Sequence, residues 1–431
     1  MSVKTFVMFI RTSTRSFKSH HRAFALAAAL FALVPAACDR SQHEEVSHVA
    51  DTIWVGTWAT AQQLVEPRNM PPEPGLSNNT LRQVVHVSLG GDRLRAKFSN
   101  AYSSRPITLN AVHIAASAVE SAIDPDTDVV LSFNGNPKVT IEPATEVVSD
   151  PFQFALTAGS NVTFTIYYGD TSPDVTGHPG SRTTSYIAEG NAVSALDLSE
   201  AIQTDHWYTI SGIDVQAAGP AAAVVVLGDS ITDGRGSGTN KQNRWPDELA
   251  QRLRTNAGTE RVAVLNQGIG GNCILRDCLG PTAVNRFEHD VLEQSGVRWL
   301  IILEGINDIG QVESAEEATA LASDLIAAYE QLIDRAHARD IRVYGATMTP
   351  FGTSFYDTPE RIEAWKTVNK WIRNSGRFDA VIDFDAALRD PENPLRLLPA
   401  ADTGDHLHPN ETGYQMMAKA VNLSLFQNSG E

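Results

Sequence analysis

Six consecutive apolar residues at positions 222–227 stand directly before a short polar turn, Gly228-Asp229-Ser230. A short, unbroken apolar run bounded by turn residues indicates a strand buried on both faces, as in a parallel sheet. Open α/β sheets carry their reactive groups just beyond the carboxyl ends of such strands. Ser230 is therefore a candidate reactive residue, although a strand followed by a polar turn without any function would look the same.

After Gly219-Pro220 the chain alternates between strand-like and helix-like segments. Helices are expected between the strands; the longest, at residues 314–339, begins with a capping box formed by Ser314 and Glu317. The last helix is expected to begin at Asn410 and to reach Leu425. Five strands joined by helices predict a doubly wound parallel sheet in a domain over residues 220–428. After the strand at 222–227, the other four are expected at residues 261–266, 297–303, 341–347 and 379–384.

Residues 52–216 have a different pattern, typical of β-structure. Apolar and polar residues alternate at residues 85–89, Gly90-Gly91 follows, and a second alternating segment covers residues 94–98. This pattern predicts a β-hairpin with one buried face. Residues 162–166 alternate in the same way, and no helical period is sustained. We therefore expect an antiparallel β-sandwich domain ahead of the α/β domain.

The first 37 residues have the composition of an export signal. Five basic residues and no acidic residue precede an apolar run at residues 23–37, which is short for a membrane span. Residues 38–51 are polar and aperiodic, which is typical of a linker. We therefore expect a signal peptide over residues 1–37 and an exported protein that is periplasmic, secreted or anchored to a membrane as a lipoprotein.

The charge of the chain excludes some classes of partner. Without the five basic residues of the leader, 29 of the 34 Lys and Arg residues remain against 51 Asp and Glu residues, so the net charge is −22. Such an acidic surface disfavours binding to nucleic acid and to anionic membranes. The sequence leaves the oligomeric state open.

Of the three cysteines, Cys38 lies at the end of the leader and the other two lie close together in the α/β domain. Cys38 follows the apolar run in a region that resembles a bacterial lipobox, with Pro35 at the position where leucine is usual. Lipidation of Cys38, which would give the only expected contact with a membrane, and plain cleavage near Ala37 therefore both remain open. Cys273 and Cys278 form an even pair in an oxidising compartment, where a disulfide between them is expected.

Four short motifs follow predicted strands and converge at one edge of the sheet. They contribute Ser230, the glycine-rich segment that ends in Gly271, Asn307 within Gly305-Ile306-Asn307-Asp308, and the pair Asp405 and His408. Acyl transfer needs such a set, because a serine hydroxyl needs an imidazole to accept its proton and a carboxylate to orient that imidazole. The oxyanion needs preorganised donors, here the backbone N–H groups of Ser230 and Gly271 and the Asn307 side chain.

In these motifs the sequence resembles the GDSL, or SGNH, hydrolases. The resemblance covers residues 221–427; Ile231 stands where the name motif has leucine, and the Cys273/Cys278 pair is not general to the family. It implies a flavodoxin-like three-layer domain, preceded by the extra β-rich domain that some members carry. It also implies Ser230 as nucleophile, His408 as general base, Asp405 as its orienting acid, and Gly271 and Asn307 in the oxyanion hole.

This resemblance implies a serine esterase that hydrolyses carboxylic esters through an acyl-enzyme without a cofactor or a metal ion, and the leader at residues 1–37 predicts that the enzyme is exported. Acetyl or other short acyl esters, with a small molecule or a glycan as the alcohol, are the expected substrates. A lipase or lysophospholipase and a transacylase with the same triad are the alternatives, and a silent glycan-binding protein is disfavoured by the complete set of site residues.

Several neighbouring residues compete for these roles. His406 competes with His408, and Gly268 and Gly270 compete with Gly271; the family spacing selects His408 and Gly271. Asp229 and Asp308 are expected to hydrogen-bond their own loop and the Ser230 turn, respectively, rather than a metal ion. Glu304, at the end of an apolar strand, is either a supporting residue or a substrate contact.

Overall fold

The computed structural model describes residues 52–427 of the chain. The predicted signal peptide at residues 1–37, the linker at 38–51 and the lipidation candidate Cys38 all lie outside this part. Within residues 52–427, no helix combines the length and the apolar character that crossing a membrane requires.

The C-terminal part of the chain contains the parallel five-stranded sheet that the sequence predicts. The strand order is β17-β16-β18-β19-β20, and each neighbouring pair is parallel. The strands are β16 (Ala222–Gly228), β17 (Val262–Gly268), β18 (Val297–Leu303), β19 (Arg342–Ala346) and β20 (Ala380–Ile382). This order places the first strand next to the centre, as in flavodoxin-like folds.

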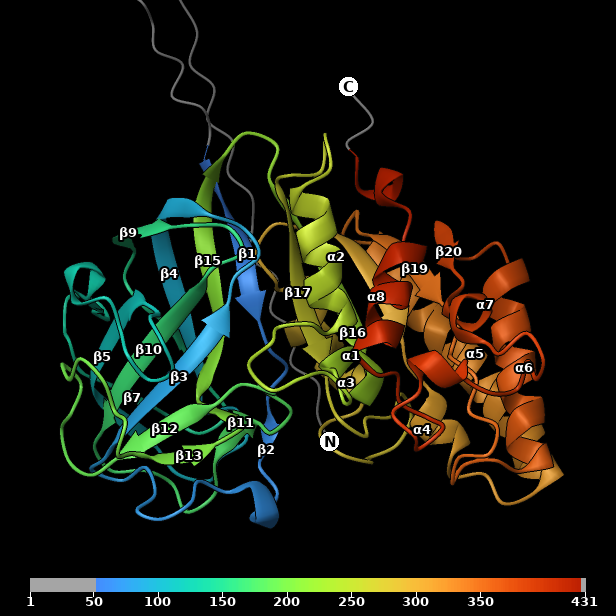
Figure 1. The fold of residues 1–431 in the computed structure, drawn as a ribbon, viewed down its shortest axis with the longest axis horizontal. Coiled ribbons are helices and arrows are strands. Elements are labelled where there is room, and N and C mark those ends of the chain that lie inside the picture. Colours follow the sequence, from blue (N-terminus) through green and yellow to red (C-terminus); the bar gives the residue numbers. More distant parts are fainter. Residues whose placement is uncertain (1–51, 428–431) are drawn as a thin grey trace, which may run out of the picture. The chain divides into compact units, whose positions relative to one another are not determined.

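Helices cover both faces of this sheet, because strands such as β16 are apolar on both sides. Residues 222, 224 and 226 of β16 pack with α2 (Trp245–Arg254) and α8 (Glu411–Ala420), whereas residues 223, 225 and 227 pack with α5 (Ala315–His337) and α6 (Pro359–Asn374). Figure 1 shows these layers. The predicted three-layer α/β fold is thus confirmed, with α7 (Phe384–Leu388) and α3 (Ala283–Phe287) as shorter additions.

The helix ends follow the caps in the sequence. The hydroxyl of Ser314 accepts a hydrogen bond from the Glu317 N–H at 3.2 Å and begins α5. Asn410 caps α8 through the N–H of Gly413 at 3.0 Å. Helix α8 ends at Ala420 rather than near Leu425, because Val421 adopts extended backbone angles.

The N-terminal part is an antiparallel β-sandwich, as predicted. Two sheets face each other across one core, in which Phe98 and Phe164 lie with their ring centroids 6.1 Å apart. The first sheet contains β1 (Thr52–Ala59), β15 (Ile210–Ala218), β4 (Gly91–Ser99), β8 (Glu146–Val148) and β9 (Phe152–Leu156). The second contains β13 (Ile202–Thr204), β12 (Ser185–Ala188), β3 (Thr80–His86), β10 (Asn161–Tyr168), β5 (Ile107–Ala116), β6 (Val129–Val130) and β7 (Val139–Ile141). A small third sheet contains β14 (Trp207–Tyr208), β11 (Thr176–His178) and β2 (Gln63–Leu64).

The predicted hairpin on either side of Gly90-Gly91 is wrong. Strand β3 pairs with β10 and β12 in one sheet, whereas β4 pairs with β15, β8 and β9 in the other. The two glycines therefore carry the chain across the sandwich. Gly90 has no room for a side chain there, because a Cβ atom would lie 2.6 Å from the carbonyl oxygen of Leu156. The alternating pattern identifies the buried face of each strand but not its pairing partner.

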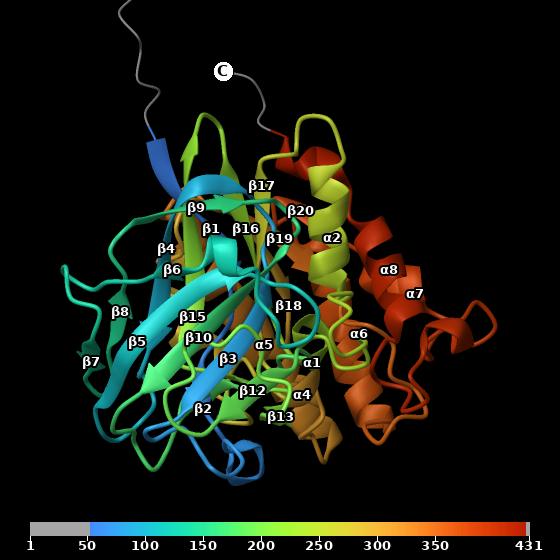
Figure 2. The same cartoon turned by 60° about the vertical axis from the view of Figure 1, so that its left-hand side comes forward.

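The sandwich and the α/β domain are in direct contact. Strand β1 lies beside β17, as both cartoon views show (Figures 1 and 2), and Gly56 leaves space for the side chain of Leu265. The hydroxyl of Ser88 accepts a hydrogen bond from the Val264 N–H at 3.1 Å. These contacts fix the sandwich against the sheet that carries the site residues.

Candidate active site

Ser230 is the first residue of a short helix, α1 (Ser230–Asp233), directly after β16. The Asp229 carboxylate begins this helix by accepting a hydrogen bond from the Ile231 N–H at 2.9 Å. Gly228 is needed at the turn, because a Cβ atom there would lie 2.2 Å from the Thr232 hydroxyl. The sharp strand-to-helix turn therefore leaves the Ser230 side chain at the edge of the sheet, 7% exposed.

Three of the predicted site residues form one chain of hydrogen bonds. Ser230 Oγ lies 2.8 Å from His408 Nε2, and His408 Nδ1 lies 2.7 Å from Asp405 Oδ2. A carboxylate opposite Nδ1 holds the proton on that nitrogen, which leaves Nε2 free to accept the proton of the serine hydroxyl. The structure thus brings Ser230, His408 and Asp405 together in the arrangement that a serine nucleophile requires.

The protonation states of this chain suit a general base. Burial lowers the pKa of His408, and the charges of Arg235 and Arg182 lower it further. The hydrogen bond to Asp405 and the charge of that carboxylate act in the opposite direction but do not outweigh burial. Burial alone would raise the pKa of Asp405, but hydrogen bonds from the backbone N–H and the ring of His408 and from the Leu407 N–H hold it well below its usual range. At neutral pH the carboxylate is therefore charged and the imidazole neutral.

The competing histidine points elsewhere. His406 has a left-handed backbone conformation, with φ +61°, and a side chain that is 48% exposed. Its Nδ1 lies 2.6 Å from Asp402 Oδ2. His406 is thus outside the hydrogen-bond chain that contains His408.

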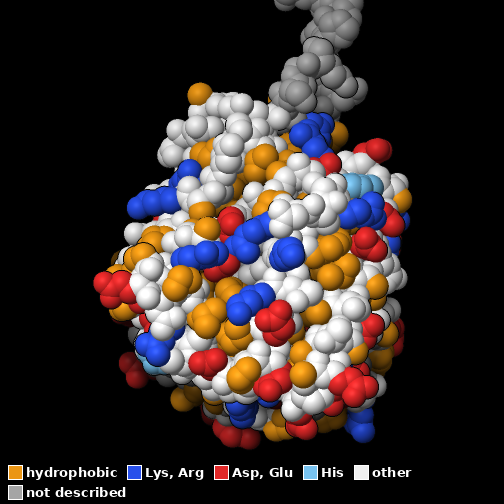
Figure 3. Space-filling view, turned by 90° about the vertical axis from the view of Figure 1, so that its right-hand side faces the viewer, with side chains coloured by type: hydrophobic (Ala, Val, Ile, Leu, Met, Phe, Trp, Pro, Cys, Tyr) orange, Lys and Arg blue, Asp and Glu red, His pale blue; other side chains and the backbone are white. Residues whose placement is uncertain are grey.

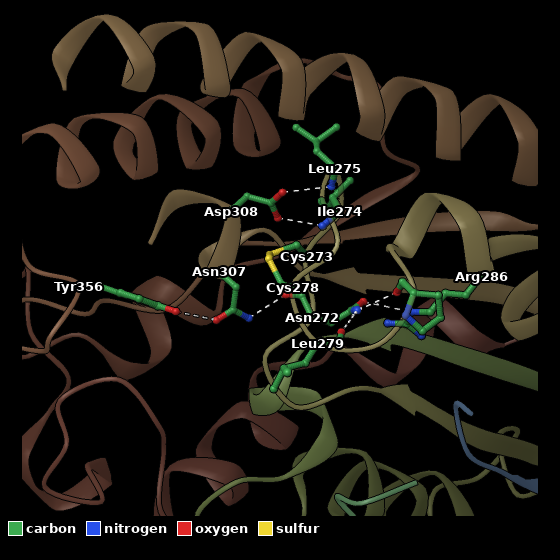
Figure 4. Close-up of a disulfide and its surroundings, with 11 residues drawn as sticks. Asn272, Cys273, Ile274, Leu275, Cys278, Leu279, Arg286, Asn307, Asp308 and Tyr356 are labelled. Atoms are coloured by element: carbon green, nitrogen blue, oxygen red, sulfur yellow. Dashed lines mark hydrogen bonds between the residues drawn. A yellow bond between two sulfur atoms is a disulfide. The ribbon is translucent and has the colours of Figure 1, made fainter. Parts of the chain in front are cut away.

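Asn307 and Gly271 lie beside Ser230 in the same pocket. Asn307 belongs to α4 (Ile306–Ile309), which follows β18, and its Nδ2 donates one hydrogen bond to the Asn272 carbonyl at 2.8 Å. Its Oδ1 accepts a hydrogen bond from the Tyr356 hydroxyl at 3.0 Å (Figure 4). These two contacts fix which end of the amide is the donor, and the second Nδ2 hydrogen remains for a ligand. Gly271 has φ +73°, a conformation that favours glycine.

Asn272 holds the loop on which Gly271 lies. Its Nδ2 donates to the carbonyl oxygens of Leu279 and Pro281, both at 2.8 Å, and its Oδ1 accepts from Arg286 Nε at 3.0 Å. Figure 4 shows the side chain at the centre of this set. Sequence reasoning missed Asn272 as a functional residue, although it follows Gly271 directly.

A disulfide joins Cys273 and Cys278 within the same loop. The carboxylate of Asp308 accepts hydrogen bonds from the N–H groups of Ile274, at 2.8 Å, and Leu275, at 3.1 Å. The expectation that Asp308 binds the Ser230 turn is therefore wrong. The side chain projects from α4 toward the disulfide loop instead, as Figure 4 shows, so α4 fixes both Asn307 and the loop that carries Gly271.

Glu304 is fully buried and does not line the pocket, so it is a supporting residue rather than a substrate contact. Its Oε2 lies 3.7 Å from Arg286 Nη2, and within residues 52–427 neither carboxyl oxygen has a hydrogen-bond partner by distance and angle. Burial, and then the charge of Asp229, raise the pKa of Glu304 well above the ordinary value, whereas the charge of Arg286 lowers it. Burial thus favours the neutral form of this carboxyl group.

The pocket in front of Ser230 has a volume of about 320 Å³ and is lined by both domains. The α/β domain adds Leu279, Phe355, Tyr356 and Leu407 to the residues described above. The sandwich contributes one wall, which includes Glu66, Arg68, Arg182 and His206. Sequence reasoning missed this wall because no local pattern reports how two domains meet. Tyr356 could have been considered, since its loop follows a strand at the same edge.

One family model and several solved structures match part of this chain. The model of the GDSL-like Lipase/Acylhydrolase family matches residues 226–416. A search of the curated proteins finds no match. Among solved structures, a putative lipolytic protein of the G-D-S-L family from Desulfitobacterium hafniense DCB-2 is 21% identical over 46% of this chain and 97% of its own, with a TM-score of 0.35. An acetylxylan esterase from Geobacillus stearothermophilus is 22% identical over 47% of this chain and 93% of its own, with a TM-score of 0.36. Residues 226–416 of this chain are therefore a domain of the GDSL-like lipase/acylhydrolase family.

Proposed function

We propose that the protein is an exported serine esterase that hydrolyses carboxylic esters of short acyl groups through an acyl-enzyme on Ser230. The observation that carries the proposal is the chain from Ser230 Oγ to His408 Nε2, at 2.8 Å, and from His408 Nδ1 to Asp405 Oδ2, at 2.7 Å. The family match to residues 226–416 supports acyl hydrolysis.

In this mechanism Ser230 Oγ attacks the ester carbonyl carbon while His408 Nε2 takes its proton. The oxyanion of the tetrahedral intermediate accepts hydrogen bonds from the backbone N–H groups of Ser230 and Gly271 and from Asn307 Nδ2. His408 then returns the proton to the leaving alcohol oxygen. Water, activated by the same imidazole, hydrolyses the acyl-enzyme, so no cofactor is used.

The pocket lining supports a short acyl group. Four of its side chains are large and apolar, Leu279, Phe355, Tyr356 and Leu407, and most of the others are polar or charged. A long acyl chain would need a continuous apolar surface to replace its contacts with water. Export is supported by the leader at residues 1–37 and by the disulfide between Cys273 and Cys278, which persists in oxidising compartments.

The test is hydrolysis of p-nitrophenyl esters from acetate to palmitate by the mature protein and by Ser230→Ala. We expect a rate that falls beyond butyrate and that disappears in the variant, with an unchanged circular dichroism spectrum. His408→Ala should also be inactive, whereas His406→Ala, two residues away and exposed, is the matched control and should keep its rate. Full turnover by Ser230→Ala would refute the mechanism, and a maximum at long chains would point to a lipase.

A further inference from the structure

Three arginine side chains gather around the pocket. Arg68 and Arg182 come from the sandwich, and Arg235 follows α1 in the α/β domain. On the face that carries α6 and α7, by contrast, acidic and basic side chains are interspersed (Figure 3). The whole chain carries a net charge of −17. A cluster of three guanidinium groups at the pocket of so acidic a protein needs an explanation.

Arg182 is the arginine of the three with the closest carboxylate. Asp233 Oδ1 lies 2.9 Å from His178 Nε2, and His178 Nδ1 lies 2.8 Å from the Ala61 carbonyl oxygen. Asp233 Oδ2 lies 3.6 Å from Arg182 Nη2. Asp233 therefore offsets the charge of only one of the three arginines.

Arg68 and Arg235 have no carboxylate as close. Glu66 accepts hydrogen bonds from the side-chain amides of Gln63, at 2.8 Å, and Asn69, at 2.9 Å. Asp405 is bonded to His408 and lies 4.0 Å from Arg235 Nε. Arg68 is exposed and has no ion-pair partner within residues 52–427. The pocket thus has an unpaired Arg68 and a loosely paired Arg235 available to a ligand.

The positions of Arg182 and Arg235 relative to the catalytic groups indicate which part of a substrate they meet. His408 Nε2 must deliver a proton to the leaving alcohol, so the alcohol lies on the His408 side of Ser230. The oxyanion donors Gly271 and Asn307 lie on the other side of the reacting carbon. Arg235 is beside Asp405, the partner of His408, and Arg182 is close enough for its charge to act on the same imidazole.

We infer that this pocket selects esters whose alcohol part carries an anionic group such as a carboxylate, and that Arg68, Arg182 and Arg235 bind that group. The inference rests on the proposed esterase function and adds the substrate class to it. Guanidinium groups suit this task, because their planar donors match a carboxylate with two hydrogen bonds. An ester on an acidic sugar has this chemistry.

The test compares two acetyl esters of the same phenol ring, 4-acetoxybenzoate, whose carboxylate is charged, and its methyl ester, which is neutral. The kcat/KM of the anionic ester divided by that of the neutral ester measures the charge preference. Dividing this ratio for each variant by the wild-type ratio cancels the difference in intrinsic reactivity between the two esters. We expect Arg68→Gln to lower this ratio about two- to fivefold, as for an exposed ion pair, mainly through the KM of the anionic ester. Arg182→Gln should act in the same direction, and salt at about 0.5 M should lower the wild-type ratio.

Two controls locate the effect. Arg93→Gln makes the same charge change at an exposed residue that does not line the pocket, and it should leave the ratio at the wild-type value. Mono(4-nitrophenyl) succinate carries its anion on the acyl part, so its preference over 4-nitrophenyl butyrate should not depend on Arg68. If Arg68→Gln lowers the preference for the succinate ester but not that for 4-acetoxybenzoate, the assignment of the arginines to the alcohol side is overturned.

The inference is overturned if the ratio changes with neither arginine substitution, Arg68→Gln or Arg182→Gln, nor with salt. If Ser230-dependent turnover is intact in that case, the proposed esterase function still holds. A binding measurement separates failure of the inference from failure of the esterase mechanism. Ser230→Ala protein should bind 4-hydroxybenzoate more tightly than its methyl ester, and adding Arg68→Gln should reduce the difference. Equal binding of both compounds by Ser230→Ala protein would overturn the inference even if neither ester is hydrolysed.

Discussion

Removing one hydroxyl group at Tyr356 should slow the reaction without touching the nucleophile or the base. In the structure this hydroxyl donates to Asn307 Oδ1 at 3.0 Å, while Asn307 Nδ2 donates to the Asn272 carbonyl at 2.8 Å. Tyr356→Phe keeps the ring, whose centroid lies 4.4 Å from that of Phe355, and deletes only the donor. The amide of Asn307 then loses one of the two contacts that orient it.

The size of the effect follows from the contact that is lost. A neutral hydrogen bond contributes roughly 0.5–1.5 kcal/mol, which corresponds to a decrease in kcat of about two- to twelvefold if the lost energy appears in the transition state. Asn307→Ala removes the oxyanion donor itself and should cost about 100- to 1000-fold. Tyr356→Phe is therefore expected to be a partial defect, since the tyrosine acts through Asn307.

Steady-state hydrolysis of p-nitrophenyl acetate by the two single variants and the double variant tests this reasoning. We expect Tyr356→Phe to lower kcat more than it raises KM. In the double variant the tyrosine change should have no further effect, because its target is absent. Independent effects that multiply in the double variant, or a wild-type kcat for Tyr356→Phe, would refute the positioning role of Tyr356.

Three further predictions concern the imidazole, the disulfide and the contact between the domains. Because burial lowers the pKa of His408 and the neutral ring is the base, kcat/KM should rise with pH and reach half of its maximum below pH 6.5; a midpoint above that value would contradict the assigned cause. Replacing Cys273 and Cys278 by serine should lower the free energy of unfolding by about 2 kcal/mol, the chain-entropy value for so short a loop. It should also lower kcat, because the loop carries the oxyanion donor. Urea denaturation measures the first effect and kinetics with and without dithiothreitol the second; an unchanged kcat would show that the disulfide does not support catalysis. His178→Phe leaves Asp233 buried without its partner and should lower the free energy of unfolding by about 3 kcal/mol, measured in urea; a loss below about 1 kcal/mol would show that Arg182 and Arg244 suffice to compensate the carboxylate.

Much of the fold could be predicted, because its strongest features are local. The apolar run at residues 222–227 is recognisable as β16, since a strand covered by helices on both faces has no polar side. The start of α5 is also recognisable, because the cap at Ser314 uses a residue only three positions away. The hairpin at Gly90-Gly91 was predicted wrongly, because alternation reports one buried face and a sandwich offers two sheets that share it.

The residues of the candidate site also differ in whether a local pattern identifies them. Ser230 and Asn307 lie in short motifs that follow β16 and β18, and Asp405 and His408 lie in a short motif just before α8, so these residues could be predicted. The partner of a carboxylate such as Asp308 depends on how a loop folds back, and no local pattern reports that. Arg182 reaches the pocket only because the sandwich contacts α1, which is a property of tertiary structure.

The most direct test of the account is to trap the acyl-enzyme. Protein mixed with p-nitrophenyl acetate and quenched in acid within the first turnovers should gain the mass of one acetyl group, and peptide mapping should place it on Ser230. Ser230→Ala should gain none, and Asn307→Ala should gain it more slowly. Turnover without any acylated intermediate, or an acetyl group stably held on another residue while Ser230→Ala remains active, would contradict the central claim.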